Sequence, residues 1–321
     1  MALLSLRGAA KSFGSRQILE GLDFDVEPGA RVGVIGPNGG GKSTLLRILA
    51  GRETVDAGEL TLRRGLVLAF LPQQPEGDDR DALATARAAR PDLHALEREL
   101  ADVESQLAAS GEDLDRIARL LRRQESVVER WTAAGGPGFE GRARALLLDV
   151  GLDEGDLTKP TRLLSGGQRK LVGLAVALLR DPDVLLLDEP ESHLDVEARE
   201  RLESTITAFA GAVAVVSHDR YLLDETVSQT AELAGGRIRM WPGNYSANTV
   251  ARELELQRQQ QLYVTQQKEI TRLEEAIRRF EDWARRVVDE RHIKQARNKQ
   301  RQIDRMEKID RPVLERRKIA L

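Results

Sequence analysis

A glycine-rich segment at residues 36–44, GPNGGGKST, lies between a short apolar run and a helical pattern. The run at 31–35, RVGVI, is typical of a buried strand, and the residues LLRILAG after the segment have helical spacing. Strand, glycine loop and helix in this order make a phosphate-binding loop, because backbone N–H groups at the start of the helix can surround a phosphate. The segment therefore predicts an α/β fold that carries a nucleotide site.

The glycine-rich segment fits the Walker A pattern, so its residues have expected contacts with ATP. Glycine lets the backbone curl around the β-phosphate without a clash from a Cβ atom. Lys42 is expected to neutralise β- and γ-phosphate oxygens, and Ser43 to bind Mg²⁺. A glycine-rich turn without a ligand is the competing interpretation, which the flanking strand and helix disfavour. The predicted ATP-binding residues here are Gly36, Pro37, Asn38, Gly39, Gly40, Gly41, Lys42, Ser43 and Thr44.

Residues 164–195 contain two further parts of a nucleotide site. The run 184–189, VLLLDE, is an apolar strand that ends in two carboxylates. Asp188 is expected to hold Mg²⁺, and Glu189 to orient and deprotonate the attacking water. Earlier in the run a small-residue loop opens a helix and forms a second phosphate clamp, made by Ser165, Gly166, Gly167 and Gln168. The two parts cannot serve the same ATP, so we expect the protein to work as a pair of like modules.

Three single residues complete the predicted site. Gln73 is expected to reach Mg²⁺ and to sense the γ-phosphate, and His218, after the apolar strand 212–216, to contact the γ-phosphate as a catalytic residue. Phe13 is expected to stack on adenine, although a core aromatic is an equal alternative. Alone, Gln73 also fits an ordinary loop and His218 a surface histidine. Their order along the chain with the two loops and the acidic strand supports the functional interpretation.

Composition excludes several classes of protein. The chain has no cysteine and four histidines, which excludes disulfides and disfavours a structural zinc site. No run approaches the roughly 18 to 20 apolar residues that span a bilayer, and the N-terminus lacks the pattern of a secretory signal. We therefore expect a cytoplasmic protein without membrane insertion.

The charge of the chain is unevenly distributed. Residues 251–321 contain 19 Lys and Arg and 13 Asp and Glu, a net charge of +6. Because the whole chain has a net charge of −3, residues 1–250 carry −9. A basic tail beside an acidic body indicates a polyanionic partner, with a solvated charged helix as the alternative. The predicted RNA contacts form a stretch without acidic residues and are Arg291, Lys294, Arg297, Lys299 and Arg301.

Two segments have helical rather than α/β patterns. Residues from about 80 to 133 predict an inserted helical hairpin with a turn at 110–113. Its first helix is expected to pack through Leu93, Leu96, Leu100, Val103 and Leu107, and its second through Leu114, Ile117, Leu121, Gln124, Val128 and Trp131. Residues 251–310 predict a second, charged hairpin, with a break between 281 and 292 that no turn residue locates.

The ordered motifs resemble the ATP-binding cassette (ABC) superfamily over most of the chain. In that family two cassettes face each other head to tail, and each ATP lies between one Walker A loop and the other cassette's signature loop. Lys42, Ser43, Gln73, Asp188, Glu189 and His218 then serve the cassette's own ATP. The resemblance implies that Ser165, Gly166, Gly167 and Gln168 serve the partner's ATP and that Asp195, in the D-loop, communicates between the sites.

Several segments resemble the ABC-F branch, whose members carry two cassettes on one chain. DEPESHLD is similar to the branch's DEPTNHLD but has Glu191 and Ser192 at its central positions. SHDRYLLD and WPGNYS are similar to the branch's SHDRxFLD and YxGNYS. Two departures bear on the rate of ATP turnover: Leu171 and Val176 stand where arginines are usual in the signature helix, and Glu191 is expected to alter the D-loop contact.

The ABC-F resemblance implies three regions and a role. These are a cassette at 1–250 with an arm at about 80–133, a charged linker at 251–310, and the start of a second, missing cassette at 311–321. The branch acts on ribosomes, where the linker reaches toward the peptidyl-tRNA, in translation or antibiotic resistance. We therefore expect a Mg²⁺-dependent ATPase, weak as a single cassette, whose partners are a second cassette, on the same chain or in a homodimer, and the ribosome with its rRNA and tRNA. The motor subunit of a membrane transporter is the alternative, and a DNA-acting cassette protein a third possibility.

Overall fold

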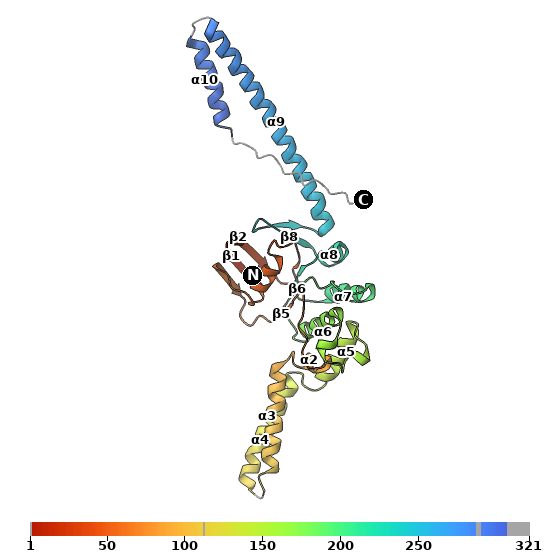
Figure 1. Cartoon of the computed structure of the whole chain (residues 1–321). Helices are drawn as coiled ribbons and strands as arrows, with labels where there is room; N and C mark the ends of the chain where they lie inside the picture. The colour runs from red at the N-terminus through yellow and green to blue at the C-terminus, as the bar shows by residue number, and fades with distance from the viewer. Residues whose placement is uncertain (1, 112, 287–289, 307–321) are drawn as a thin grey trace. The chain divides into compact units, whose positions relative to one another are not determined.

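The computed structural model of the chain describes residues 2–111, 113–286 and 290–306 (Figure 1). The strands are β1 (Leu4–Phe13), β2 (Arg16–Val26), β3 (Arg31–Ile35), β4 (Ala57–Leu62), β5 (Leu68–Leu71), β6 (Val184–Asp188), β7 (Ala212–Val216), β8 (Gln229–Ala234) and β9 (Arg237–Pro242). The helices are α1 (Lys42–Leu49), α2 (Ala82–Arg87), α3 (Pro91–Ala108), α4 (Leu114–Ala133), α5 (Phe139–Asp149), the 3₁₀ turns η1 (Glu154–Asp156) and η2 (Thr161–Leu163), α6 (Gly166–Leu178), α7 (Val196–Ala208), α8 (Arg220–Thr226), α9 (Tyr245–Arg286) and α10 (Glu290–Asp304).

Two sheets form the body of the first compact unit, which ends at Ser246. The larger sheet has the strand order β5-β6-β7-β3-β8-β9, in which only β9 is antiparallel to its neighbour. The smaller sheet is antiparallel, with the order β2-β1-β4. Parallel strands connected through helices confirm the α/β fold predicted from the phosphate-binding loop.

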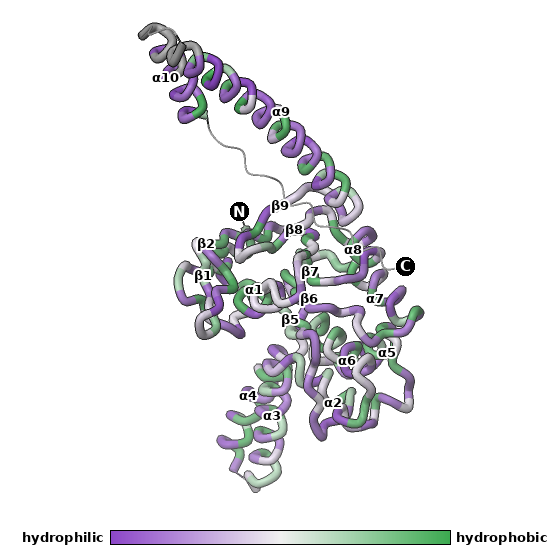
Figure 2. Tube along the Cα trace, turned by 45° about the horizontal axis from the view of Figure 1, so that its top comes forward, coloured by the Kyte–Doolittle hydropathy of each residue, from purple (hydrophilic) through white to green (hydrophobic). Residues whose placement is uncertain are grey.

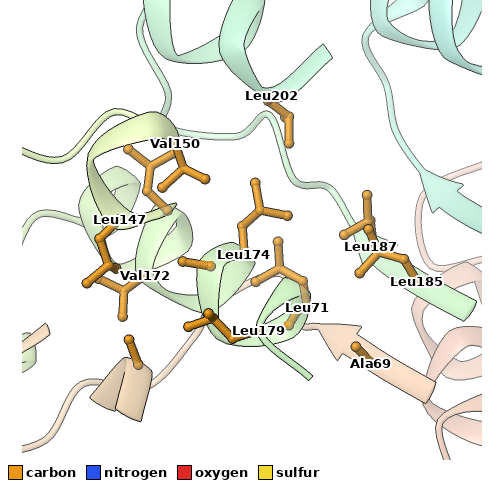
Figure 3. Close-up of a cluster of buried hydrophobic side chains, with 14 of the residues drawn as sticks. Ala69, Leu71, Leu147, Val150, Val172, Leu174, Leu179, Leu185, Leu187 and Leu202 are labelled. Atoms are coloured by element: carbon orange, nitrogen blue, oxygen red, sulfur yellow. The ribbon is translucent and has the colours of Figure 1, made fainter. Parts of the chain in front are cut away.

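The larger sheet is buried on both faces, which explains the uninterrupted apolar runs of its central strands. Along β6, Leu185 and Leu187 belong to one core, whereas Val184 and Leu186 belong to the other. Successive side chains of a strand point to opposite faces, so this alternation places the sheet between the two cores. Figure 3 shows Leu185 and Leu187 in the first core, together with Leu71 of β5 and Leu174 of α6. Truncating such a leucine to alanine typically costs about 2–5 kcal/mol.

The inserted hairpin consists of α3 and α4, which pack on each other. It begins at Pro91, later than the predicted start near 80, because α2 is a separate short helix that packs on α5 and α6. The turn predicted at 110–113 ends in a helix cap, since the Asp113 carboxylate accepts a hydrogen bond from the Arg116 N–H at 3.0 Å. Glu112 lies outside the described residues.

The predicted packing face of α4 is wrong in half of its positions. Leu114, Leu121 and Val128 are exposed, whereas Leu120 and Val127 are buried. Positions 117, 124 and 131 fit two stripes with helical spacing. One stripe adds positions 121 and 128, and the other adds positions 120 and 127. The helix turns the stripe with Leu120 and Val127 inward, which the sequence pattern does not determine.

The second compact unit begins at Ala247 and contains most of α9, followed by α10. Figure 2 colours α9 mainly hydrophilic, with apolar residues at intervals. Helix α9 begins at Tyr245, six residues before the predicted start of the linker at 251, and ends at Arg286; α10 begins at Glu290. Leu273 of α9 and Ile303 of α10 are buried apolar residues of this unit. Residues 311–321, the predicted start of a second cassette, lie outside the described residues.

Candidate active site

The predicted site residues follow four neighbouring strands of the larger sheet. Gln73 comes after β5, Asp188 and Glu189 end β6, His218 follows β7, and the Walker A segment follows β3. These strands are adjacent and parallel in the order β5-β6-β7-β3. The carboxyl ends of parallel strands meet at one edge of a sheet, which is where ligands bind in open α/β folds. The topology therefore brings together residues that are up to 182 positions apart, from Gly36 to His218.

The Walker A loop ends at the N-terminus of α1. Gly41 is the N-cap residue in a left-handed conformation, with φ of 100°, and a Cβ atom there would lie 2.6 Å from Cγ2 of Ile18. Only glycine fits this position without displacing a neighbour. The buried Lys42 ammonium donates hydrogen bonds to the carbonyls of Gly36 and Pro37, both at 3.0 Å. Burial lowers the pKa of Lys42, and the carboxylates of Glu189 and Asp188 oppose this shift.

Ser43 and Asp188 are two of the three residues predicted to hold Mg²⁺, with Gln73 as the third, and they contact each other. The Ser43 hydroxyl donates to Oδ1 of Asp188 at 3.0 Å, and the Asp188 side chain is buried. Burial raises the pKa of Asp188, partly opposed by the Ser43 hydrogen bond and reinforced by the charge of Glu189. A buried carboxylate whose charge is disfavoured, next to a hydroxyl, suits a hard divalent cation such as Mg²⁺.

Glu189 has an unusual backbone conformation for a residue other than glycine, with φ of +47°. Its Oε2 accepts a hydrogen bond from Nε2 of Gln73 at 2.7 Å, and its Oε1 lies 3.7 Å from Nε2 of His218. Left-handed backbone at such residues costs of order 1–3 kcal/mol and concentrates at functional sites. The three predicted residues therefore form one group around the Glu189 carboxylate.

A pocket of about 460 Å³ lies over these residues. Its lining contains most of the predicted ATP-binding residues together with Gln73, Glu189 and His218. Phe13 is 48% exposed and lies under the Lys11 ammonium at 5.3 Å, so it is not the core aromatic that the sequence left as an alternative. Two further residues were not predicted: Ile18 lines the pocket, and the Arg16 guanidinium donates to the Gly39 carbonyl at 2.9 Å. Neither lies in a recognisable motif.

The signature loop lines a second hollow, which adjoins the first at Gln73, a residue that lines both. Ser165 caps α6 by accepting a hydrogen bond from the Gln168 N–H at 3.1 Å, while the Gln168 side chain accepts one from the Ser165 N–H at 2.9 Å. This reciprocal capping box fixes the start of the helix. Gly166 and Gly167 line a pocket beside the loop with Pro75 and His193. Asp195 is the N-cap of α7 and accepts a hydrogen bond from the Ala198 N–H at 2.9 Å.

The predicted RNA contacts lie in α10. Lys294, Arg297 and Arg301 are exposed and Lys299 is half-buried. Arg291 belongs to the same helix. Over the described ranges, no helix has the length and apolar character needed to cross a membrane.

Two family profiles and several curated proteins match this chain. A family profile described as ABC transporter matches residues 19–192, and a second profile with the same description matches residues 231–321. The tylosin resistance ATP-binding protein TlrC of Streptomyces fradiae is 36% identical over 81% of this chain and 47% of its own length. The energy-dependent translational throttle protein EttA of Haemophilus influenzae is 34% identical over 82% of this chain and 47% of its own length.

Solved structures are similar in fold. The dimeric, post-hydrolysis ATP-binding cassette MJ0796, bound to ADP and Pi, matches with a TM-score of 0.53 and 20% identity, over 74% of this chain and 98% of that one. This likeness supports the fold alone. The chain spans about half the length of the curated relatives it matches.

Proposed function

Because this chain belongs to the ATP-binding cassette family, with relatives in the ABC-F branch, we propose that it is one cassette of a twin-cassette ATPase that acts on ribosomes. Residues up to Ser246 form an ABC ATPase domain. The observation that carries the proposal is the separation of two half-sites. Lys42, Glu189 and His218 surround one pocket, whereas the signature glycines line another. A complete ATP site then needs the signature loop of a second cassette.

Six residues at the site have a definite task in ATP hydrolysis. The Lys42 ammonium exchanges the carbonyls of Gly36 and Pro37 for phosphate oxygens, a neutralisation that its buried position strengthens. Glu189 accepts a proton from the attacking water, and Gln73 holds that carboxylate in place. His218, close to Glu189, donates to the γ-phosphate. Ser43, Asp188 and Gln73 would hold Mg²⁺, which when bound neutralises the charge on the phosphate oxygens.

A ribosomal partner is supported by charge and by the relatives. Lys294, Arg297 and Arg301 present exposed positive charge on α10, and cations arranged in this way bind RNA phosphates. The name of EttA refers to translation, and that of TlrC to tylosin resistance. In our proposal ATP closes two cassettes and stabilises a ribosome-bound state, and hydrolysis through Glu189 releases it.

Sedimentation of the natural full-length protein with ribosomes tests this function. Glu189→Gln should retain ATP binding and lower kcat by about 10²–10⁴-fold, the range for loss of a general base. This variant should pellet with ribosomes in ATP, less so as salt rises. Absence of co-sedimentation at every salt concentration would refute the ribosomal role. Purification in detergent with a multi-span membrane protein would instead support a transporter motor.

A second pair of variants tests the basic helix. Replacing Lys294, Arg297, Lys299 and Arg301 with glutamine should weaken binding and flatten its salt dependence, by about one unit of slope for each RNA phosphate that is no longer neutralised. The matched control replaces four exposed arginines of the cassette, Arg52, Arg64, Arg180 and Arg237. Equal weakening in both quadruple variants would show that α10 makes no specific contact.

A further inference from the structure

A buried polar cluster joins the signature helix α6 to the loops that follow β6 and β7. It consists of the buried Lys170, Glu191 and Ser217 and the half-buried Ser192. Lys170 is 2% exposed and Glu191 is 7% exposed, so two opposite charges are removed from water in one place. Burial of charge is costly unless partners compensate it, and such clusters are therefore held in defined geometry.

Glu191 fastens the loop after β6 to the turn that carries His218. Its Oε1 accepts a hydrogen bond from the Ser217 hydroxyl at 2.6 Å and another from the His218 backbone N–H at 3.2 Å. The Ser217 hydroxyl in turn accepts from the Asp219 N–H at 2.8 Å. The turn before α8 is thus built around one buried carboxylate. The hydrogen bond to the His218 backbone N–H fixes the backbone position from which the His218 side chain extends.

Lys170 connects the same region to the signature helix. Its ammonium donates to the carbonyl of Glu189, to the Ser192 hydroxyl and, at 3.2 Å, to the Ser192 carbonyl. Among the neighbouring carboxylates, Glu191 has the largest electrostatic effect on this ammonium. Among the described residues, Oε2 of Glu191 has no hydrogen-bond donor and Glu191 makes no ion pair with Lys170, so the ammonium acts on this carboxylate only through its charge and through the loop that both residues contact.

The backbone of Glu189 is held from both sides by these elements. Its N–H donates to the carbonyl of Val216, the last residue of β7, at 2.8 Å, and its carbonyl accepts from Lys170. A residue other than glycine keeps a left-handed backbone conformation only when the contacts around it hold that conformation in place. Lys170 is one turn from the signature glycines, so a displacement of α6 acts directly on the carbonyl of Glu189.

We propose that Glu191 is a positioning residue for His218 and that Lys170 couples it to the signature helix, so that the state of the signature loop affects the catalytic group of the same cassette. Two departures from the DEPTNHLD pattern, Glu191 and Ser192, both belong to this cluster. The inference rests on the proposed ATPase function. It assigns to Glu191 a role within one cassette rather than the D-loop contact expected from the sequence.

Steady-state kinetics of the chain test the role of Glu191. Glu191→Ala removes the acceptor and should lower kcat by about 10- to 100-fold, the cost of a misplaced catalytic group, with KM for ATP changed less than about threefold. Glu191→Gln keeps an acceptor oxygen of the same reach and should restore part of kcat. Glu200→Gln, on the exposed face of α7, is the matched control. If Glu191→Ala does not fold, Ser217→Ala, which removes the hydroxyl donor to the carboxylate, should give the same split between kcat and KM.

A double-mutant cycle tests positioning through His218. If Glu191 acts through His218, the loss from His218→Ala should be smaller in the Glu191→Ala background than in the unmutated chain. A second cycle, between Lys170→Met and Glu191→Gln, should also be non-additive. Additive effects in both cycles, or equal kcat for the alanine and glutamine variants of Glu191, would overturn the inference.

Glu189→Gln separates failure of the inference from failure of the proposed function. If this variant hydrolyses ATP as fast as the unmutated chain, the ATPase assignment of the pocket is wrong. If Glu189→Gln is inactive while both Glu191 variants keep full kcat, the pocket assignment stands and the positioning role of Glu191 is rejected.

Discussion

Gln73 donates a hydrogen bond from Nε2 to Oε2 of Glu189 at 2.7 Å, which connects the end of β5 to the end of β6. The residue expected to sense Mg²⁺ and the γ-phosphate thus orients the expected general base. Gln73→Ala should therefore lower kcat by about 10- to 100-fold while ATP binding changes little. The substitution removes the orientation of the general base, whereas the phosphate contacts of the pocket remain. Rates and fluorescent-nucleotide affinity measure the two effects. Gln257→Ala, an exposed position of α9, is the control.

The chemistry of this pair could be read from the sequence, but its geometry could not. An apolar run ending in Asp188 and Glu189 marks the carboxyl end of a buried strand, so the sequence locates the carboxylates correctly. The order β5-β6-β7-β3 depends on pairing between distant segments, which no local pattern encodes. Lys170 was missed for another reason: lysine is rarely buried, and one near the start of a helix is expected to face water.

The arm offers a direct test of helix packing through two adjacent valines. Val127 is fully buried in α4, whereas Val128 is 39% exposed. Val127→Ala should lower the free energy of unfolding by about 2 kcal/mol, since it removes buried methyl groups and leaves the space they filled empty. Val128→Ala, the matched control, should change it by less than about 0.5 kcal/mol. Urea denaturation measures both, and a larger decrease for Val128→Ala would contradict the observed face of the helix.

Ser165 has a structural task that can be separated from its expected contact with a partner's ATP. Its hydroxyl caps α6, so Ser165→Arg should lower the free energy of unfolding by about 1 kcal/mol. At dilutions where the chain is monomeric, Ser165→Asn, which keeps the cap, should leave the ATPase rate unchanged, because the signature loop is expected to serve another cassette. Any further loss of rate in Ser165→Arg would then reach Glu189 of the same cassette through α6 and Lys170. Light scattering establishes the monomer, and a lowered monomeric rate of Ser165→Asn would place this loop at its own ATP. Because it keeps a capping oxygen, Ser165→Asn also controls for stability.

Lys170 gives a pH dependence of stability with a defined sign. Burial lowers the pKa of Lys170 below its ordinary value of 10.5, opposed by the charge of Glu191. Between the lowered pKa and 10.5 the unfolded chain therefore binds more protons than the folded chain, and the contribution of Lys170 to the free energy of unfolding rises with pH. It is smallest at neutral pH and reaches its full value once the unfolded lysine has also lost its proton.

Urea denaturation of the unmutated chain and of Lys170→Met, from about pH 7 upward, measures this contribution. The difference in free energy of unfolding between the two proteins should shift in favour of the unmutated chain as pH approaches 10.5. Lys268→Met removes an exposed lysine of α9 and is the control for the loss of a lysine side chain at the surface. A difference that is constant with pH, or that moves in favour of Lys170→Met, would show that the ammonium is not desolvated in the folded protein. A shift in the expected direction would mean that a buried, charged lysine links α6 to the loop of Glu189 at neutral pH. Burying this charge lowers the free energy of unfolding, a cost that an apolar side chain at the same position would not have.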